Sequence, residues 1–205
     1  MRILILGATG RVGRVMTELA LRDGHEVTVL VRDADKVEKH DRLNIIEGDA
    51  CREADIERAM TGCEAVISAL NTDGTTTLSD SIPLIIIQMQ RVGIRRIVTI
   101  GTAGILQSRE EPQRLRYESN ESRRRSTRAA EEHRRVYERL SATDLEWTIV
   151  CPTYLPDGIY TGQYRVERDY LPEGGKEISV ADTAEFAYQQ LVDRTYVGAR
   201  VGIAY

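Results

Sequence analysis

The chain has 205 residues, of which 41% are hydrophobic and 29% charged, enough apolar material for the core of one globular domain. Its net charge of -4 gives no basic field for nucleic acid or an anionic membrane, and three cysteines are too few for a disulfide framework or a zinc site. No apolar run reaches the roughly 18 residues of a membrane span, and the chain begins on an apolar run rather than a signal peptide, so we expect a cytoplasmic protein.

The first half of the chain alternates short apolar runs with helical patterns. The runs predict strands at residues 2–7, within 23–32, at 43–49, at 64–70 and at 95–101. Apolar residues at helical spacing predict helices at residues 11–22, 53–60 and 79–93. Strands that alternate with helices of this length imply βαβ units, and therefore a parallel sheet.

The helix at residues 79–93 has recognisable ends. Ser79 or Asp80 is expected to cap its start, and Gly93 to close it. Pro83 is expected in the first turn, where a missing N–H costs nothing.

The second half closes the same architecture. Residues 145–152 read as a sixth strand, 163–168 as an edge strand, 179–193 as a helix with Phe186 inward, and 199–205 as a closing strand. We therefore predict an α/β fold with a doubly wound, mostly parallel sheet and helices on both faces. Residues 1–205 form a single domain in this prediction, and residues 152–205 complete the side that faces a substrate.

A glycine-rich turn joins the first strand to the first helix in "ILGATGRVGRVM" (residues 5–16). Small residues here let the backbone approach a pyrophosphate, and the N–H groups at the start of the helix point at its charge. The alternative is a tight turn that binds nothing. The predicted cofactor-binding residues of the turn are Gly7, Thr9, Gly10, Arg11, Val12 and Gly13.

The end of the second strand indicates which dinucleotide is bound. Arg32 stands where an NAD site usually has an acidic residue, and Lys36 follows one helical turn later. With Arg11, these cations favour the 2′-phosphate of NADP(H). Asp33 lies next to Arg32, and the alternative is that Arg32 and Lys36 form an ordinary solvated face.

Residues after the next two strands lie at the same edge of the sheet. Asp49 is expected to face the adenine beside Ala50, and Asn71 to border the pyrophosphate or nicotinamide ribose beside Ala69 and Leu70. Asp49 and Asn71 are also common turn formers, so a purely structural role is the alternative.

The nicotinamide is expected near the ends of the fifth and sixth strands. Thr102 follows the fifth strand, and Pro152, Thr153 and Tyr154 end or follow the sixth. Thr102 and His133 are the candidate catalytic residues. The alternatives are that Thr102 is only a cap or turn residue, that Tyr154 only packs, and that His133, among arginines, is exposed.

One common catalytic pair is absent. Tyr-x-x-x-Lys supplies a proton in many carbonyl reductases, but the three lysines, Lys36, Lys39 and Lys176, have no tyrosine four residues before them. This favours hydride transfer to an acceptor that needs little acid help, or cofactor binding without catalysis.

A segment rich in both charges spans residues 108–140, with ten arginines and seven glutamates. It is open to interpretation as a lid, a dimer face or a nucleic-acid patch, but the mixed signs favour solvated helix faces with Glu–Arg pairs. Residues 108–122 are expected to form a mobile loop near the acceptor.

The chain resembles the atypical short-chain dehydrogenases, most of all the biliverdin reductase B / NADPH-dependent flavin reductase family. The stretches "ILGATGRVGR", "EVTVLVRDADKV", "IVTIGTAGIL" and "WTIVCPTYLPDGIYTGQYRVE" carry this resemblance across nearly the whole chain. It implies a Rossmann-like fold, NADP(H) as cofactor and a flavin, quinone or tetrapyrrole as the small-molecule acceptor.

The resemblance also assigns roles to residues. It implies that Thr102 replaces the serine the family has after this strand, that His133 matches a helix histidine, and that Gly104 leaves a more open pocket than the family's bulky residue. The predicted function is an NADPH-dependent reductase of a flavin (FMN or FAD) or similar acceptor. We expect a monomer or homodimer without a metal or nucleic acid. The alternatives are a non-catalytic NADP(H) sensor with a protein partner and a quinone reductase.

Overall fold

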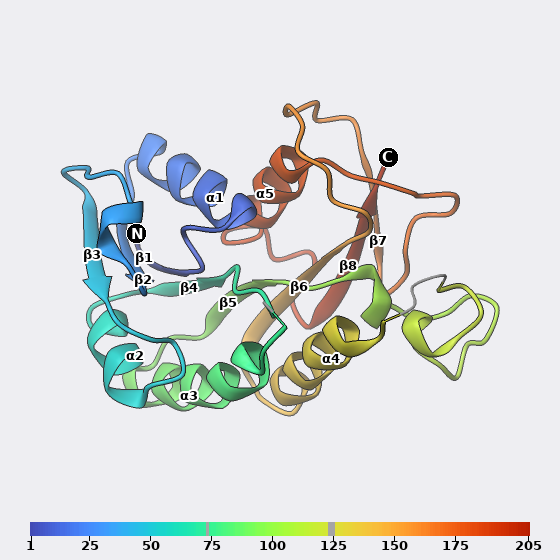
Figure 1. Ribbon diagram of the computed structural model, residues 1–205, viewed down its shortest axis with the longest axis horizontal. Helices are drawn as coiled ribbons and strands as arrows, with labels where there is room; N and C mark the ends of the chain where they lie inside the picture. Colours follow the sequence, from blue (N-terminus) through green and yellow to red (C-terminus); the bar gives the residue numbers. More distant parts are fainter. Residues whose placement is uncertain (73, 123–125) are drawn as a thin grey trace.

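One mixed sheet forms the centre of the computed structural model, which describes residues 1–72, 74–122 and 126–205 (Figure 1). Asp73, in the turn after the fourth predicted strand, and Arg123, Arg124 and Arg125 of the charged segment lie outside the described residues. Across the sheet the strand order is β3-β2-β1-β4-β5-β6-β8-β7.

The strands follow the predicted apolar runs closely. They are β1 (Arg2–Leu6), β2 (Glu26–Val31), β3 (Leu43–Glu47), β4 (Ala65–Ser68), β5 (Arg96–Ile100), β6 (Glu146–Pro152), β7 (Arg165–Arg168) and β8 (Ala199–Ala204). Every neighbouring pair is parallel except β7 and β8. The strand β7 is the last in the strand order and so lies at an edge of the sheet, as its alternating sequence predicts.

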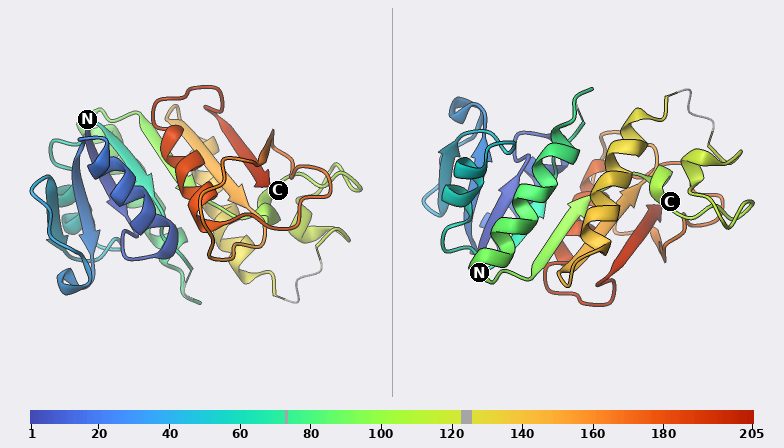
Figure 2. Two further views of the ribbon diagram at one scale, coloured as in Figure 1. Left: turned by 90° about the horizontal axis from the view of Figure 1, so that it is seen from above. Right: turned by 90° about the horizontal axis from the view of Figure 1, so that it is seen from below.

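Helices cover both faces of the sheet. The described α-helices are α1 (Arg11–Arg22), α2 (Glu53–Met60), α3 (Thr77–Val92), α4 (Arg128–Ser141) and α5 (Val180–Gln189), and short 3₁₀ turns occur at η1 (Ala34–Lys36), η2 (Ala103–Ile105) and η3 (Arg116–Glu118). The helices α1 and α5 lie side by side on one face, and α2, α3 and α4 on the other (Figures 1 and 2). The predicted doubly wound α/β fold is confirmed.

Each face of the sheet has its own apolar core, because successive residues of a strand point to opposite faces. In β1, Ile3 and Ile5 pack with α1 and α5 residues, whereas Leu4 and Leu6 pack in the other core. All four side chains are fully buried. A strand covered on both faces has to be apolar at every position, which is why "ILIL" reads as a continuous run.

The helix α3 differs from its prediction at the N-terminus. It begins at Thr77 after Thr76, not at Ser79 or Asp80, and it ends at Gly93 as predicted. Pro83 therefore lies beyond the first turn, inside the helix. The earlier start has a local cause: the N–H of Asp80 donates to the carbonyl of Thr76, which adds a turn before the predicted cap.

The strand order places a ligand-binding edge. The chain adds β2 and β3 on one side of β1, then returns to add β4, β5 and β6 on the other. Ligands of open α/β sheets bind beyond the carboxyl ends of the strands, at the point where this direction reverses. The turn after β1 and the residues after β4 occupy that point here.

Candidate cofactor and acceptor sites

The glycine turn is shaped first by the needs of the fold. Gly7 has a φ of 79°, and a Cβ atom on it would lie 2.4 Å from the carbonyl oxygen of Ala69; one on Gly13 would lie 2.1 Å from that of Gly7. A Cβ atom on Gly10 would meet its nearest neighbour at 3.2 Å, and Gly10 is exposed. Gly7 and Gly13 therefore bring β1, α1 and the end of β4 together, which the tight-turn alternative also explains, whereas Gly10 leaves open backbone at the edge.

The N-terminus of α1 fits an anionic group. Gly10 is the N-cap residue and makes no side-chain capping bond, and the first turn of α1 contains no acidic residue. The first N–H groups of a helix have no acceptor inside it, and the helix dipole adds positive potential there. These donors include the backbone N–H of Val12, whose side chain is buried, and the exposed Thr9 lies just before the helix. Such a group of donors fits the pyrophosphate of a dinucleotide.

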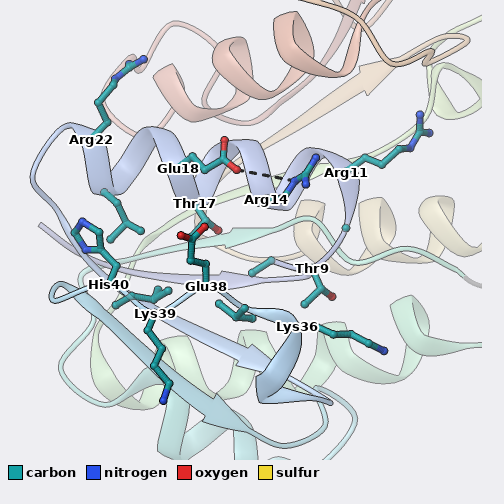
Figure 3. A pocket seen from close by; sticks show the side chains of 15 residues that line it. Thr9, Arg11, Arg14, Thr17, Glu18, Arg22, Lys36, Glu38, Lys39 and His40 are labelled. Atoms are coloured by element: carbon teal, nitrogen blue, oxygen red, sulfur yellow. Dashed lines mark ion pairs between the residues drawn. The ribbon is translucent and has the colours of Figure 1, made fainter.

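Arg11 lies at the start of α1, well separated from Lys36 (Figure 3). Its guanidinium donates to the carbonyl of Leu155 at 2.9 Å and to the carboxylate of Asp157 at 3.0 Å, both in the loop after β6. Arg11 therefore links the glycine turn to that loop in this structure, rather than adding charge beside Arg32 as the sequence indicated.

The 2′-phosphate side of the predicted site lies at the end of β2. Arg32 is exposed directly after β2, and the ammonium of Lys36 lies 3.3 Å from the carboxylate of Asp33. That carboxylate also accepts the N–H of Asp35 at 3.1 Å. Asp33 therefore caps η1 and forms an ion pair with Lys36. This explains why an acidic residue stands beside the cations Arg32 and Lys36.

A groove of about 780 Å³ runs from this point along α1, between the helix and residues 36–43 (Figure 3). Thr9, Gly10 and Lys36 line it, and Lys39 and Glu38 lie along the same wall. The groove exists because a short 3₁₀ turn, rather than a full helix, joins β2 to β3. Its end at Thr9, Gly10 and Lys36 reaches the predicted phosphate side of the cofactor site, whereas Arg32 is not among its lining residues.

The residues after β3 and β4 have local structural roles. The carboxylate of Asp49 accepts the N–H of Cys51 at 2.9 Å, and the side-chain oxygen of Asn71 accepts the N–H of Thr72 at 2.8 Å. Both predicted side chains are exposed, Ala50 is buried, and Ala69 and Leu70 are half-buried. The structure brings this group to the predicted edge, where Asp49 and Asn71 also form turns.

Thr102 lies at the mouth of a second cavity. Its hydroxyl accepts the N–H of Gly104 at 3.4 Å and caps η2, so the cap alternative describes part of its role. The cavity, which we call the acceptor pocket, has a volume of about 460 Å³. It is lined by Thr102, Ala103, Gly104, Arg116, Tyr117, Glu121, Ser122, Ser126, Thr127, Ala129, Ala130, Thr153 and Lys176. Most of these side chains are polar or small.

The three predicted residues at the end of β6 lie in different surroundings. Pro152 is buried, and the hydroxyl of Thr153 donates to the carbonyl of Lys176 at 3.3 Å inside the acceptor pocket. Tyr154 is 60% exposed. Thr153 is therefore the member of this group that shares the pocket with Thr102, and Tyr154 does not pack into the core.

His133 lies in α4 with its side chain turned into the protein. It is only 8% exposed, so the alternative of an exposed histidine is wrong. Burial lowers the pKa of its imidazole to about 4. Among the described residues His133 lines neither the groove nor the acceptor pocket. His133 is therefore not among the residues that line the pocket with Thr102, and its catalytic role stays a prediction.

Three charged residues of the acceptor pocket were missed by sequence reasoning: Arg116, Glu121 and Lys176. Lys176 is far from Thr102 along the chain and belongs to no motif, so the sequence gives no signal for it. Arg116 and Glu121 form an ion pair within the segment predicted to be a loop near the acceptor. The segment does lie beside Thr102, and it contains further Glu–Arg pairs.

Glu121 organises this loop. Its carboxylate accepts the hydroxyl of Ser108 at 2.9 Å, the N–H of Glu110 at 2.9 Å and the N–H of Arg109. Burial raises the pKa of Glu121, but these bonds and the guanidinium of Arg116 outweigh it and hold the pKa below its ordinary value. The predicted mobility of residues 108–122 stays a prediction.

In residues 1–72, 74–122 and 126–205, no helix is long and apolar enough to cross a membrane. Over the same ranges, no group of three or more His, Cys, Asp or Glu residues is placed to hold a metal ion.

Comparison with known proteins gives the context of these two sites. A family model described as NAD(P)H-binding matches residues 7–194. The uncharacterized protein YwnB of Bacillus subtilis is 26% identical over 195 residues, which span 91% of this chain and 89% of that protein.

Solved structures superpose over the full length. A "putative epimerase" of Bacteroides thetaiotaomicron has a TM-score of 0.86 at 26% identity and covers 100% of this chain and 96% of its own. A "putative NADH-flavin reductase" of Streptococcus pneumoniae has a TM-score of 0.82 at 25% identity, with coverage of 100% and 99%. The strand order and these likenesses confirm the Rossmann-like fold.

Proposed function

Because this chain belongs to the NAD(P)H-binding family, we propose that it is an NADPH-dependent reductase that transfers hydride to a flavin or a similar planar acceptor. The observation that supports this most is the acceptor pocket beside Thr102 and Thr153, on the same sheet edge as the glycine turn. The likeness to a "putative NADH-flavin reductase" and the resemblance to the biliverdin reductase B family agree with it.

The chain's own residues supply binding and orientation. The open backbone at Gly10 and the first N–H groups of α1 hold the pyrophosphate, and Arg32 and Lys36 hold the 2′-phosphate. Asp49 and Ala50 border the adenine, and residues 69–71 border the pyrophosphate or the nicotinamide ribose. When bound, the nicotinamide supplies hydride chemistry at the mouth of the acceptor pocket. Thr102 and Thr153 then orient the nicotinamide or the acceptor with their hydroxyl groups.

The absence of a Tyr-x-x-x-Lys pair agrees with an acceptor that takes hydride directly. Such an acceptor receives its proton from water that enters the open pocket. The protein contributes by holding the two rings about 3–3.5 Å apart, because proximity and orientation supply most of the rate enhancement. We do not include His133 in this proposal, since it is buried and does not line the pocket.

The test is NADPH oxidation by the purified protein, followed at 340 nm with FMN, FAD, riboflavin or a quinone added. We expect turnover with a flavin. Tight NADP⁺ binding with no turnover on any acceptor would contradict the enzyme and favour the non-catalytic sensor, and turnover with quinones alone would favour the quinone reductase. The monomer or homodimer state and the cytoplasmic location stay predictions.

A further inference from the structure

Among the described residues that line the acceptor pocket, one has an aromatic side chain. This residue is Tyr117, in the 3₁₀ turn η3, and the remaining lining residues are small, hydroxyl-bearing or charged. Tyr117 is half-buried, so part of its surface is covered by protein and part is open to a ligand. An aromatic ring at the wall of a cavity offers a face on which a flat conjugated ligand stacks.

Close packing around Gly104 fixes where the Tyr117 side chain begins. A Cβ atom on Gly104 would lie 3.1 Å from the Cβ of Ala130 and 3.4 Å from the Cβ of Tyr117. The same point lies 3.6 Å from the methyl group of Thr102. The lack of a side chain at position 104 therefore lets η3 and α4 approach η2 closely. Tyr117 and Thr102 border one small space as a result.

The far end of the Tyr117 side chain is held by charged groups. Nη1 of Arg134 on α4 donates to the Tyr117 hydroxyl at 2.9 Å, and this hydroxyl donates to the carboxylate of Glu118 at 3.3 Å. Arg134 in turn forms ion pairs with Glu118 and Glu138, both at 2.7 Å. The second oxygen of Glu118 accepts the N–H of Leu115 at 3.1 Å, which closes η3. The ring is thus held at both ends before a ligand enters, and such preorganisation lowers the entropy cost of binding.

The hydroxyl of Tyr117 is committed to this charged group. Arg134, Glu118 and Glu138 are not among the residues that line the acceptor pocket, although Tyr117 is. The part of Tyr117 that the pocket offers to a ligand is therefore the ring, and a proton donated from the hydroxyl would have to leave its bond to Glu118. This arrangement suits a stacking residue rather than a proton donor.

We propose that the acceptor ring stacks on Tyr117, and that Arg134 is a positioning residue that keeps the Tyr117 ring in place. Tyr117 contacts the acceptor and not the dinucleotide, so it sets the affinity for the acceptor alone. The inference rests on the proposed function, because it takes this pocket as the place of the acceptor.

Riboflavin is the probe, because it carries the flavin ring without a phosphate. Equilibrium dialysis with the protein saturated with NADP⁺ measures its affinity, and the fluorescence of the bound flavin is measured separately. A phenol stacked on the ring quenches flavin fluorescence by giving an electron to the excited state, which a phenyl ring does not do. We expect the wild type to quench bound riboflavin almost completely. Y117F is expected to bind it within about threefold of the wild type and to leave it bright.

Two further variants separate the ring from its support. Y117L keeps an apolar side chain without the ring and is expected to bind riboflavin about tenfold more weakly. R134A frees the far end of the ring and is expected to weaken binding about threefold, with part of the fluorescence restored. Both are expected to keep the wild-type affinity for NADP⁺. The control is Y160F, which removes the hydroxyl of a 54% exposed tyrosine that lines neither the groove nor the acceptor pocket; it is expected to match the wild type in affinity and quenching.

Three results would overturn the inference: no binding of riboflavin, bright riboflavin on the wild type, or equal affinity of the wild type and Y117L. The proposed function fails separately. If the wild type oxidises NADPH with riboflavin while bound riboflavin stays bright, the reductase stands and the role of Tyr117 is disproved. If no acceptor supports NADPH oxidation, the reductase is disproved, while the quenching in the wild type and in Y117F still decides whether Tyr117 binds the ring.

Discussion

Arg32 is the residue whose role depends most on the identity of the cofactor. It is exposed directly after β2, where the 2′-phosphate of NADP(H) is expected. Replacement of Arg32 by Ala removes a charge-assisted contact, so we expect NADPH to bind about 10- to 100-fold more weakly and NADH to change by less than about twofold. Titration of intrinsic fluorescence with each nucleotide measures both affinities. Equal loss for NADPH and NADH would contradict the role of Arg32.

The burial of His133 makes the stability of the folded protein depend on pH. Burial holds the imidazole neutral, with its pKa at about 4 against an ordinary value of about 6.5. Between these values the unfolded chain binds a proton that the folded chain does not, so stability is full above about pH 6.5 and falls as the pH drops toward 4. Between pH 7 and pH 5 this costs about 2 kcal/mol.

Urea unfolding at pH 7 and pH 5 tests this effect. The variant H133L is expected to lose about 2 kcal/mol less than the wild type over that interval, because its side chain takes no proton. The variant H40L removes an exposed histidine and serves as the control. If H133L and the wild type lose stability in parallel, the buried histidine is not the source of the pH dependence.

At the scale of elements, buried carboxylates tie loops to the helices that frame the site. Asp182, at the start of α5, accepts the N–H of Thr161 at 2.9 Å, its hydroxyl at 2.8 Å, the N–H of Gly162 at 2.9 Å and the hydroxyls of Ser179 and Tyr205 at 3.1 and 2.7 Å. Burial raises the pKa of Asp182, but these bonds outweigh it and lower the pKa. One residue thus joins the loop after β6, α5 and the end of β8.

The variant D182N is expected to lose about 2–4 kcal/mol of unfolding free energy. The side-chain NH₂ group of asparagine is a donor, and it would face N–H and O–H groups that now donate to the carboxylate. Urea unfolding at pH 7 measures the loss. The matched control is D157N in the same loop, whose carboxylate makes an exposed ion pair with Arg11; its loss is expected to be below about 1 kcal/mol. Similar losses in the two variants would show that burial and hydrogen bonding of Asp182 do not stabilise the loop.

At the scale of the whole molecule, the predicted cofactor site would couple the two halves of the sheet. The predicted site spans the turn after β1, the end of β2 and the ends of β4 to β6, so a bound dinucleotide contacts both sides of the reversal in strand order. A ligand that binds only the folded state stabilises it by about 2.7 kcal/mol at 100 times its Kd.

Thermal unfolding with NADP⁺ and NAD⁺ at equal concentration tests the assembled site. For a chain of this size we expect NADP⁺ at 100 times its Kd to raise Tm by about 5–10 °C. NAD⁺ at that concentration is expected to raise Tm much less, because it lacks the 2′-phosphate. A Tm that neither nucleotide changes would contradict the dinucleotide site itself.

The sequence by itself determined most of the elements and the position of the glycine turn. Buried parallel strands must be apolar throughout and helices must repeat their apolar face, so local patterns located β1 to β8 and the helices α1, α2, α3 and α5. The bounds of α4 were not predicted, because it lies in the segment rich in both charges. The start of α3 escaped prediction, because the backbone bond from Asp80 to Thr76 leaves no trace in residue type. The close backbone approach at Gly7 and Gly13 explains why these positions are glycine, and the phosphate-binding role of the turn stays a prediction.

Only the tertiary structure decided which side chains share a space. It turned His133 into the protein, linked Arg11 to Asp157, and brought Lys176 together with Thr102 and Arg116. The physical reason is that strand and helix periods follow from residues close in sequence, whereas the acceptor pocket forms between loops from separate crossovers. Where those loops meet depends on the packing of the whole sheet, which no local pattern encodes.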